Sequence, residues 1–160
     1  MTVGFNYIKA ELKKTEYSNA EHLAITVDGR QLDQIINDFY PEGSYLGLVP
    51  TLLDWLYNER ERSVVWDRIK TGENSRQIVP ILMCPDDCDF SCTIILADVV
   101  CKDNKVIWER LGVDNTALRG GKTIGEVIQW LDKIKPMVFP REEYQECVQT
   151  FKQALMEAAK

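Results

Sequence analysis

The stretch QIVPILMCPDDCDFSCTIILADVVC, residues 77–101, places two apolar runs on either side of a short loop. Both runs, residues 78–83 and 93–100, are rich in β-branched side chains, which is typical of buried strands. The loop between them carries three aspartates and three cysteines, and the whole stretch contains no Lys, Arg or His. We therefore predict two central antiparallel strands, joined by an acidic loop at one end of a sheet.

Three further segments have strand patterns. Residues 23–27 predict a strand that ends at an Asp-Gly turn. Residues 5–13 suit either a strand or a helix, and we favour the strand because Phe and Tyr alternate at its start. Residues 106–111 follow an Asp-Asn turn and predict a strand beside the central two, with Trp108 and Arg110 on one face.

Other segments have helical patterns. Residues 32–39 and 51–56 carry apolar side chains at helical spacing. The charged segment after them predicts a loop, with a brief strand or packed turn at residues 64–66. Residues 123–134 begin with a Thr/Glu capping box, stop before a proline and predict a helix. A last helix is predicted after Pro140.

Hairpins followed by helices predict an α+β fold, with one antiparallel sheet of about four to six strands covered by helices. Two of these helices are expected at the C-terminus. The 160 residues fit one globular domain, residues 1–160. The side chains expected in the core are Ile95, Leu96, Val99, Trp108, Leu131 and Phe151.

Composition excludes several classes of function. A net charge of −6 and a pI near 4.9 argue against nucleic-acid binding, because neutralising phosphates requires a concentrated basic face. The chain starts without a signal-peptide pattern, and no run approaches the ~18 apolar residues of a membrane span. We therefore expect a cytoplasmic protein whose five cysteines are reduced thiols.

Cys84, Cys88 and Cys92 are evenly spaced, which raises the question of a metal site. Structural zinc usually takes a second pair of ligands elsewhere, and both outer cysteines fall where the two strands are predicted. Buried free cysteines mostly behave as small apolar side chains, so we predict neither a metal nor a cofactor. A cysteine nucleophile needs a base, and His22, the only histidine, is expected at an ordinary surface position.

Four segments carry a resemblance to a known group of proteins. They are IVPILMCPDDCDFSCTIILADV, VIWERLGVD, a helix containing Trp-Leu, and FPREEYQECVQTF. From Val49 onward the chain resembles a family of small, uncharacterised cytoplasmic proteins of Bacillus and related bacteria. The resemblance implies no catalytic or binding residues. Small acidic α+β proteins of this kind are similar in style to the immunity proteins of bacterial toxin systems, which is an analogy of class.

The leading hypothesis is a non-enzymatic, acidic binding protein, such as an immunity protein that neutralises a basic toxin. An acidic surface steers a basic partner toward itself and can cover a cationic active site. The expected anchor is the loop carboxylates Asp86, Asp87 and Asp89. The expected flank consists of Glu59, Glu61, Trp55 and Trp66.

Two alternatives remain open. The first is a small-ligand-binding or thiol-dependent enzyme that uses Cys88, the cysteine expected in the loop. The second is a structural or regulatory module that acts by assembly. A pocket lined by Arg68, Arg110 and Cys88 would favour the enzyme, whereas an unbroken acidic surface would favour the binding protein.

Overall fold

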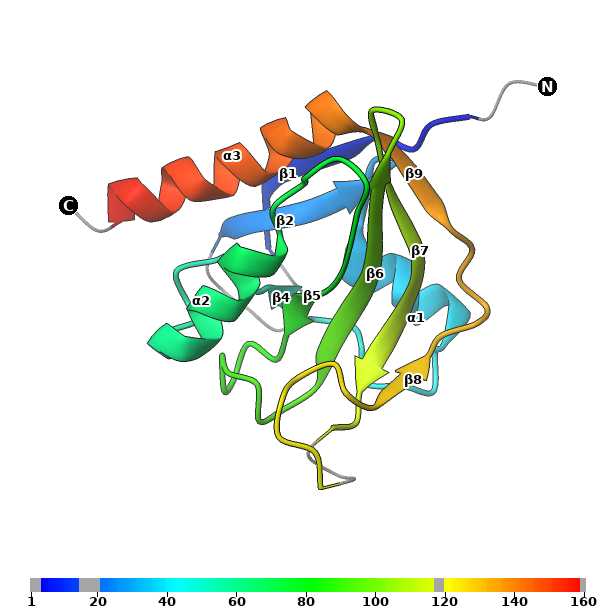
Figure 1. Cartoon of the computed structure of the whole chain (residues 1–160). Coiled ribbons are helices and arrows are strands. Elements are labelled where there is room, and N and C mark those ends of the chain that lie inside the picture. The colour runs from blue at the N-terminus through cyan, green and yellow to red at the C-terminus, as the bar shows by residue number, and fades with distance from the viewer. Residues whose placement is uncertain (1–3, 15–20, 117–119, 159–160) are drawn as a thin grey trace.

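The two apolar runs of residues 77–101 form the long central strands of the larger of two antiparallel sheets (Figure 1). The computed structural model describes residues 4–14, 21–116 and 120–158. The larger sheet has six strands: β4 (Val49–Pro50), β5 (Ser75–Met83), β6 (Ile94–Lys102), β7 (Lys105–Asp114), β8 (Ile128–Trp130) and β9 (Met137–Pro140). The smaller has three: β1 (Ile8–Lys13), β2 (His22–Val27) and β3 (Arg30–Gln31).

The larger sheet is built around β6. Its partner β5 runs antiparallel to it from the pair Ser75–Cys101 to the pair Met83–Ile94. A turn at Asp103 and Asn104, both with positive φ, leads directly into β7 on the other side of β6. The far edge of β7 is shared by β9, which pairs with its first half, and β8, which pairs with its second half. The predicted central hairpins are therefore confirmed.

Three helices are described: α1 (Leu32–Phe39), α2 (Glu59–Arg68) and α3 (Arg141–Ala158). The α+β class is confirmed, but the prediction of two C-terminal helices is wrong, because α3 is the only helix there among the described residues. A single sheet was also expected, and the structure has two. Helix α3 packs against β1, β9 and β7, so it covers both sheets (Figure 1).

The core lies between the sheets and α3. All six side chains predicted to be buried are buried, and Trp108 is among the largest of them. The Trp108 ring packs edge-on against Phe139 at 5.1 Å between centroids, and its Nε1 donates a hydrogen bond of 3.3 Å to Tyr144 Oη. This aromatic cluster joins β7, β9 and α3.

Helix α2 occupies a segment whose sequence predicts a loop with a brief strand or a packed turn, so that prediction is wrong. Asn58 caps its first turn, because the Asn58 side-chain oxygen accepts hydrogen bonds from the amides of Arg60 (3.0 Å) and Glu61 (3.1 Å). Acidic residues in the first turn and Arg68 in the last suit the helix dipole. The helix predicted for residues 51–56 is a series of turns instead.

The helix predicted for residues 123–134 is also wrong, since this segment contains β8 and turns. Gly125 has a φ of 94°, which a right-handed helix cannot contain. Its amide donates to Asp114 Oδ1 at 3.0 Å, and the Val127 amide donates to Thr116 Oγ1 at 3.1 Å. The end of β7 thus holds the segment in an extended path, which its β-branched side chains favour.

Candidate functional site: the loop between β5 and β6

The loop of residues 84–93 leaves β5 after Met83 and returns to β6 at Ile94. Its first half is a tight turn in which the Cys88 amide donates to the Cys84 carbonyl at 3.0 Å, and Cys88 has a positive φ of 50°. In its second half, Asp89 Oδ1 accepts hydrogen bonds from the amide of Ser91 (2.9 Å) and from its hydroxyl (2.5 Å). Local hydrogen bonds therefore define the shape of the loop.

The acidic residues of the loop differ in their exposure. Asp86 and Asp87 are exposed, whereas Asp89 is half-buried and turned toward Ser91. The loop is fastened to α2, because the Phe90 amide donates to Glu61 Oε1 at 3.0 Å. Glu59 is exposed in the same first turn of that helix. The structure therefore joins Glu61 to the loop, close to Asp89 of the predicted anchor. We use the name acidic face for the five predicted carboxylates of the loop and of the first turn of α2, which are Asp86, Asp87, Asp89, Glu59 and Glu61.

Partial burial and the nearby charge of Asp89 raise the pKa of Glu61, although the hydrogen bond from the Phe90 amide acts in the opposite direction. Arg60, which is exposed, lies between Glu59 and Glu61 in the sequence, so a positive charge interrupts the acidic face. Arg60 and Lys122 also line a shallow cleft of about 310 Å³ beside Glu61 and Phe90. The acidic face thus borders on two cationic side chains.

The two tryptophans expected to flank the anchor lie elsewhere. Trp66 lines a groove between α2 and α3, together with Val148 and Met156. Trp55 follows β4 and packs edge-on against His22, with 5.1 Å between the ring centroids. His22 was expected at the surface, but it is buried, because it begins β2 and Trp55 covers it. The structure therefore does not bring Trp55 and Trp66 together with the loop.

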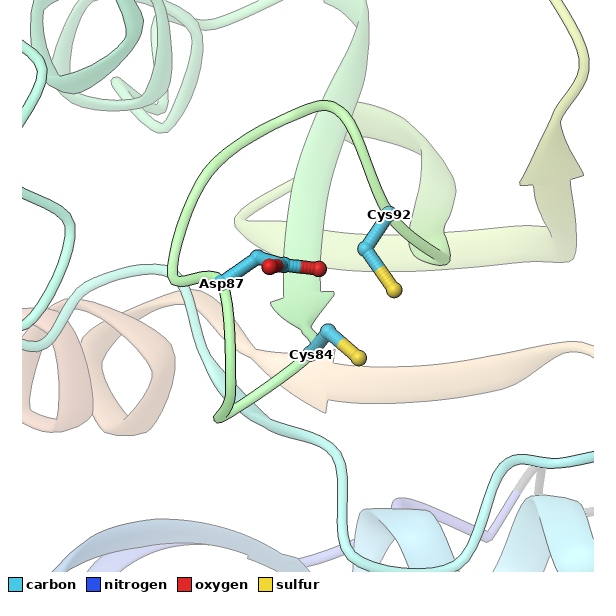
Figure 2. A group of neighbouring side chains, drawn as sticks. All are labelled: Cys84, Asp87 and Cys92. Carbon is cyan, nitrogen blue, oxygen red and sulfur yellow. The ribbon is translucent and has the colours of Figure 1, made fainter.

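Cys84 and Cys92 lie in the loop rather than inside the strands, so their predicted strand positions are wrong. Pro85 has no amide hydrogen for a continued ladder, and β5 ends two residues before it. Both cysteines are half-buried. Their sulfur atoms and a carboxylate oxygen of Asp87 all lie within 4.8 Å of one another (Figure 2). These three side chains form the group of the described residues best suited to hold a metal ion.

Cys88 is set apart from that trio. Its thiol donates a hydrogen bond of 3.1 Å to the Pro85 carbonyl. Partial burial raises the pKa of the Cys88 thiol, and the charges of Asp89, Asp86 and Asp87 raise it further. A thiol in these surroundings is protonated at neutral pH and is a poor nucleophile.

A second cleft, of about 720 Å³, lies on the larger sheet and is lined by Arg68, Arg76 and Arg110 around Asp98. Arg76 donates to the Asp98 carboxylate from Nε (3.0 Å) and Nη2 (2.7 Å), and Arg110 donates from Nε (3.1 Å). The Arg68 guanidinium is held by the carbonyls of Ile78 and Ile124, each at 3.1 Å. Cys88 is not among the lining residues, so the arginines and the thiol do not form one pocket.

A β-bulge explains how Arg110 reaches this cleft. In the pairing of β6 with β7, Asp98 lies opposite Arg110 and Val99 opposite Trp108, so Glu109 is an extra residue in β7. A bulge reverses the alternation of side chains, which turns Trp108 to the core and Arg110 toward Asp98. The prediction that Trp108 and Arg110 share a face is therefore wrong. The sequence did hold a signal for this site, because an aspartate in the middle of an apolar strand requires a partner.

Comparisons of the chain with protein-family models, with curated proteins and with solved structures find no match. The resemblance to small proteins of Bacillus and related bacteria therefore stays a prediction. Within the described ranges, no helix is long and apolar enough to cross a membrane.

Proposed function

We propose that this chain is a non-enzymatic, acidic binding protein of the cytoplasm, which captures a basic protein partner in the manner of an immunity protein that neutralises a toxin. The observation that carries the proposal is the acidic face, in which exposed Asp86 and Asp87 stand on a loop fastened to α2 by the Glu61–Phe90 hydrogen bond. The net charge of −6 adds a long-range field of the same sign. Such a field steers a basic partner and raises its association rate.

The surroundings of the loop thiol favour binding over thiol chemistry. Burial and the nearby carboxylates raise the pKa of the Cys88 thiol, whereas a catalytic cysteine needs a neighbouring base or cation that lowers it. The ring of His22, the one histidine, has its Nδ1 3.0 Å from the Leu23 carbonyl oxygen and packs against Trp55. Neither feature supports a cysteine–histidine pair.

The cleft around Asp98 favours a second candidate function, which is the binding of a small anionic ligand. Two guanidinium groups, those of Arg76 and Arg110, bind the buried Asp98 carboxylate, and Arg68 lines the same cleft. These three cationic side chains outnumber the two carboxylates of the lining, Asp98 and Glu126. Arginine presents several donors in a planar arrangement that matches carboxylates and phosphates. Binding of an anion in this cleft would be a form of the small-ligand alternative in which Cys88 takes no part.

The test begins with affinity capture by the full-length chain from a lysate of the native host, followed by identification of the captured protein by mass spectrometry. Association kinetics with the purified partner are then measured at low and high salt. The binding variant is the double substitution Asp86→Asn/Glu59→Gln, which removes two exposed charges of the acidic face. The matched control is Glu42→Gln/Asp132→Asn, which removes two exposed charges outside the acidic face.

We expect the binding variant to associate roughly 10-fold more slowly at low salt, with a weaker dependence on salt, because exposed charges act mainly on the association rate. The control variant should associate at nearly the same rate, and with nearly the same salt dependence, as the unmodified protein. Equal effects of both variants would show that only net charge matters and would move the binding surface elsewhere. Capture of a small anion in place of any basic protein would favour the arginine-lined cleft.

A further inference from the structure

The trio of Cys84, Asp87 and Cys92 is the feature that the proposed function leaves unused. Figure 2 shows the two thiols side by side, with the carboxylate of Asp87 directed toward them from the turn between. The three residues come from both stems of the loop and from its first turn, and their donor atoms lie within 4.8 Å of one another.

The spacing fits a small tetrahedral cation. Zinc–thiolate bonds are about 2.3 Å long and zinc–carboxylate bonds about 2.0–2.2 Å. Two sulfurs on a tetrahedral zinc are therefore about 3.8 Å apart, which lies inside the observed limit. The side chains would need only small rotations to reach a common ion, since the loop backbone already holds them together.

We propose that Cys84, Asp87 and Cys92 bind a zinc ion, with a fourth position open to solvent. Two thiolates disfavour the hard cations magnesium and calcium, which prefer oxygen ligands. The carboxylate disfavours Cu(I), which prefers soft ligands alone. Zinc accepts both kinds of donor. Cys84 and Cys92 lie in the loop rather than inside the strands, so one of the two grounds on which the sequence disfavours a metal no longer applies.

The experiment titrates Co²⁺, a spectroscopic substitute for zinc, into the metal-free full-length chain under a non-thiol reductant, and then displaces it with Zn²⁺. We expect one cobalt per chain, with absorption bands of a tetrahedral ion bound by thiolate. The double substitution Cys84→Ser/Cys92→Ser should abolish the thiolate bands, and each single substitution should weaken them. Asp87→Asn, a change at an exposed residue that the fold should tolerate, should keep the bands and weaken Zn²⁺ binding by at least about 10-fold.

One variant in the same loop serves as a matched control. Cys88→Ser removes a thiol that bonds to the Pro85 carbonyl. It should bind Co²⁺ and Zn²⁺ as the unmodified chain does. The proposal is overturned by cobalt spectra without thiolate bands, by a control that loses as much affinity as the ligand variants, or by a Cys84–Cys92 disulfide in protein alkylated at the moment of lysis. Each of these outcomes is independent of partner capture, because Asp86→Asn/Glu59→Gln leaves all three ligands in place.

Discussion

Replacing Asp98 with Asn tests whether one buried carboxylate holds three neighbouring strands together. Asp98 lies in the middle of β6, and its side chain is 1% exposed. It accepts hydrogen bonds from Arg76 of β5 at 3.0 and 2.7 Å and from Arg110 of β7 at 3.1 Å. Asparagine has the same shape but no charge, so it cannot accept all of these bonds.

The free energy of unfolding that Asp98→Asn should remove lies between two limits. Hydrogen bonds to a charged group contribute about 1.5–3 kcal/mol each when they are buried, whereas exposed ion pairs contribute only about 0.2–1 kcal/mol. The carboxylate is buried, but Arg76 and Arg110 are 58% and 46% exposed, so water can hydrate them once the charge is gone. We therefore expect Asp98→Asn to lower the free energy of unfolding by about 2–3 kcal/mol at pH 7.

The pH dependence follows from the same contacts. Burial alone would raise the pKa of Asp98, but the hydrogen bonds and charges of Arg76 and Arg110 outweigh it and hold the pKa below its usual range. Because the folded pKa lies below the unfolded value of about 3.9, the stabilisation is complete above that value and is lost as the pH falls through the folded pKa. The difference between the two proteins should therefore be constant near neutrality and shrink in acid.

Denaturant melts followed by tryptophan fluorescence at pH 7 and near pH 3 would measure both effects. The matched control is Glu109→Gln, whose carboxylate lies 3.6 Å from Arg76 Nη2 but is 41% exposed. Its cost should stay within about 0.5 kcal/mol. A loss below about 1 kcal/mol for Asp98→Asn, an equal loss for the control, or a difference that grows in acid would refute the reasoning.

Two further changes test the assignment of the core and of α2. Leu96 is fully buried in β6, so Leu96→Ala should lower the free energy of unfolding by about 2–5 kcal/mol, measured by denaturant melts, and a loss under about 1 kcal/mol would contradict its central position. Asn58→Ala should cost about 1 kcal/mol, because it removes the cap that accepts two amides of the first turn. Ser63→Ala, on the exposed side of α2, should change the free energy of unfolding by no more than about 0.5 kcal/mol. A loss as large as that of Asn58→Ala would argue against the cap.

Most of the larger sheet could be predicted because its strands carry their own signal. The β-branched runs of β5 and β6, and the turn at Asp103 and Asn104, depend on neighbouring residues alone. Helix α2 is not predicted, although Asn58 and the acidic first turn are visible in the sequence, because residues 64–66 suit a brief strand or a packed turn as well. Its single fully buried residue, Val65, leaves little of the apolar periodicity that marks a helix.

The conformation of residues 123–134 could not be predicted in the same way, because distant residues decide it. The apolar residues of this segment fit a helical stripe, and its Thr/Glu pair fits a capping box. The carboxylate of Asp114 nevertheless accepts a hydrogen bond from the Gly125 amide, and the hydroxyl of Thr116 accepts one from the Val127 amide. Tertiary hydrogen bonds therefore override a local pattern that suits two conformations.

Sequence located the acidic loop, but it could not show that Glu61 fastens it or that two of its cysteines meet. The first contact spans 29 residues, and the second depends on where β5 and β6 stop. The Phe90–Glu61 hydrogen bond and the proximity of the two cysteines both bear on how well the loop is ordered. Ordering one residue costs roughly 1–2 kcal/mol, so carboxylates on a free loop would lose much of their attraction for a partner to the cost of ordering. A bond at one end, from Phe90 to Glu61, and a metal that joins Cys84 to Cys92 at the other would hold Asp86 in place before any partner arrives.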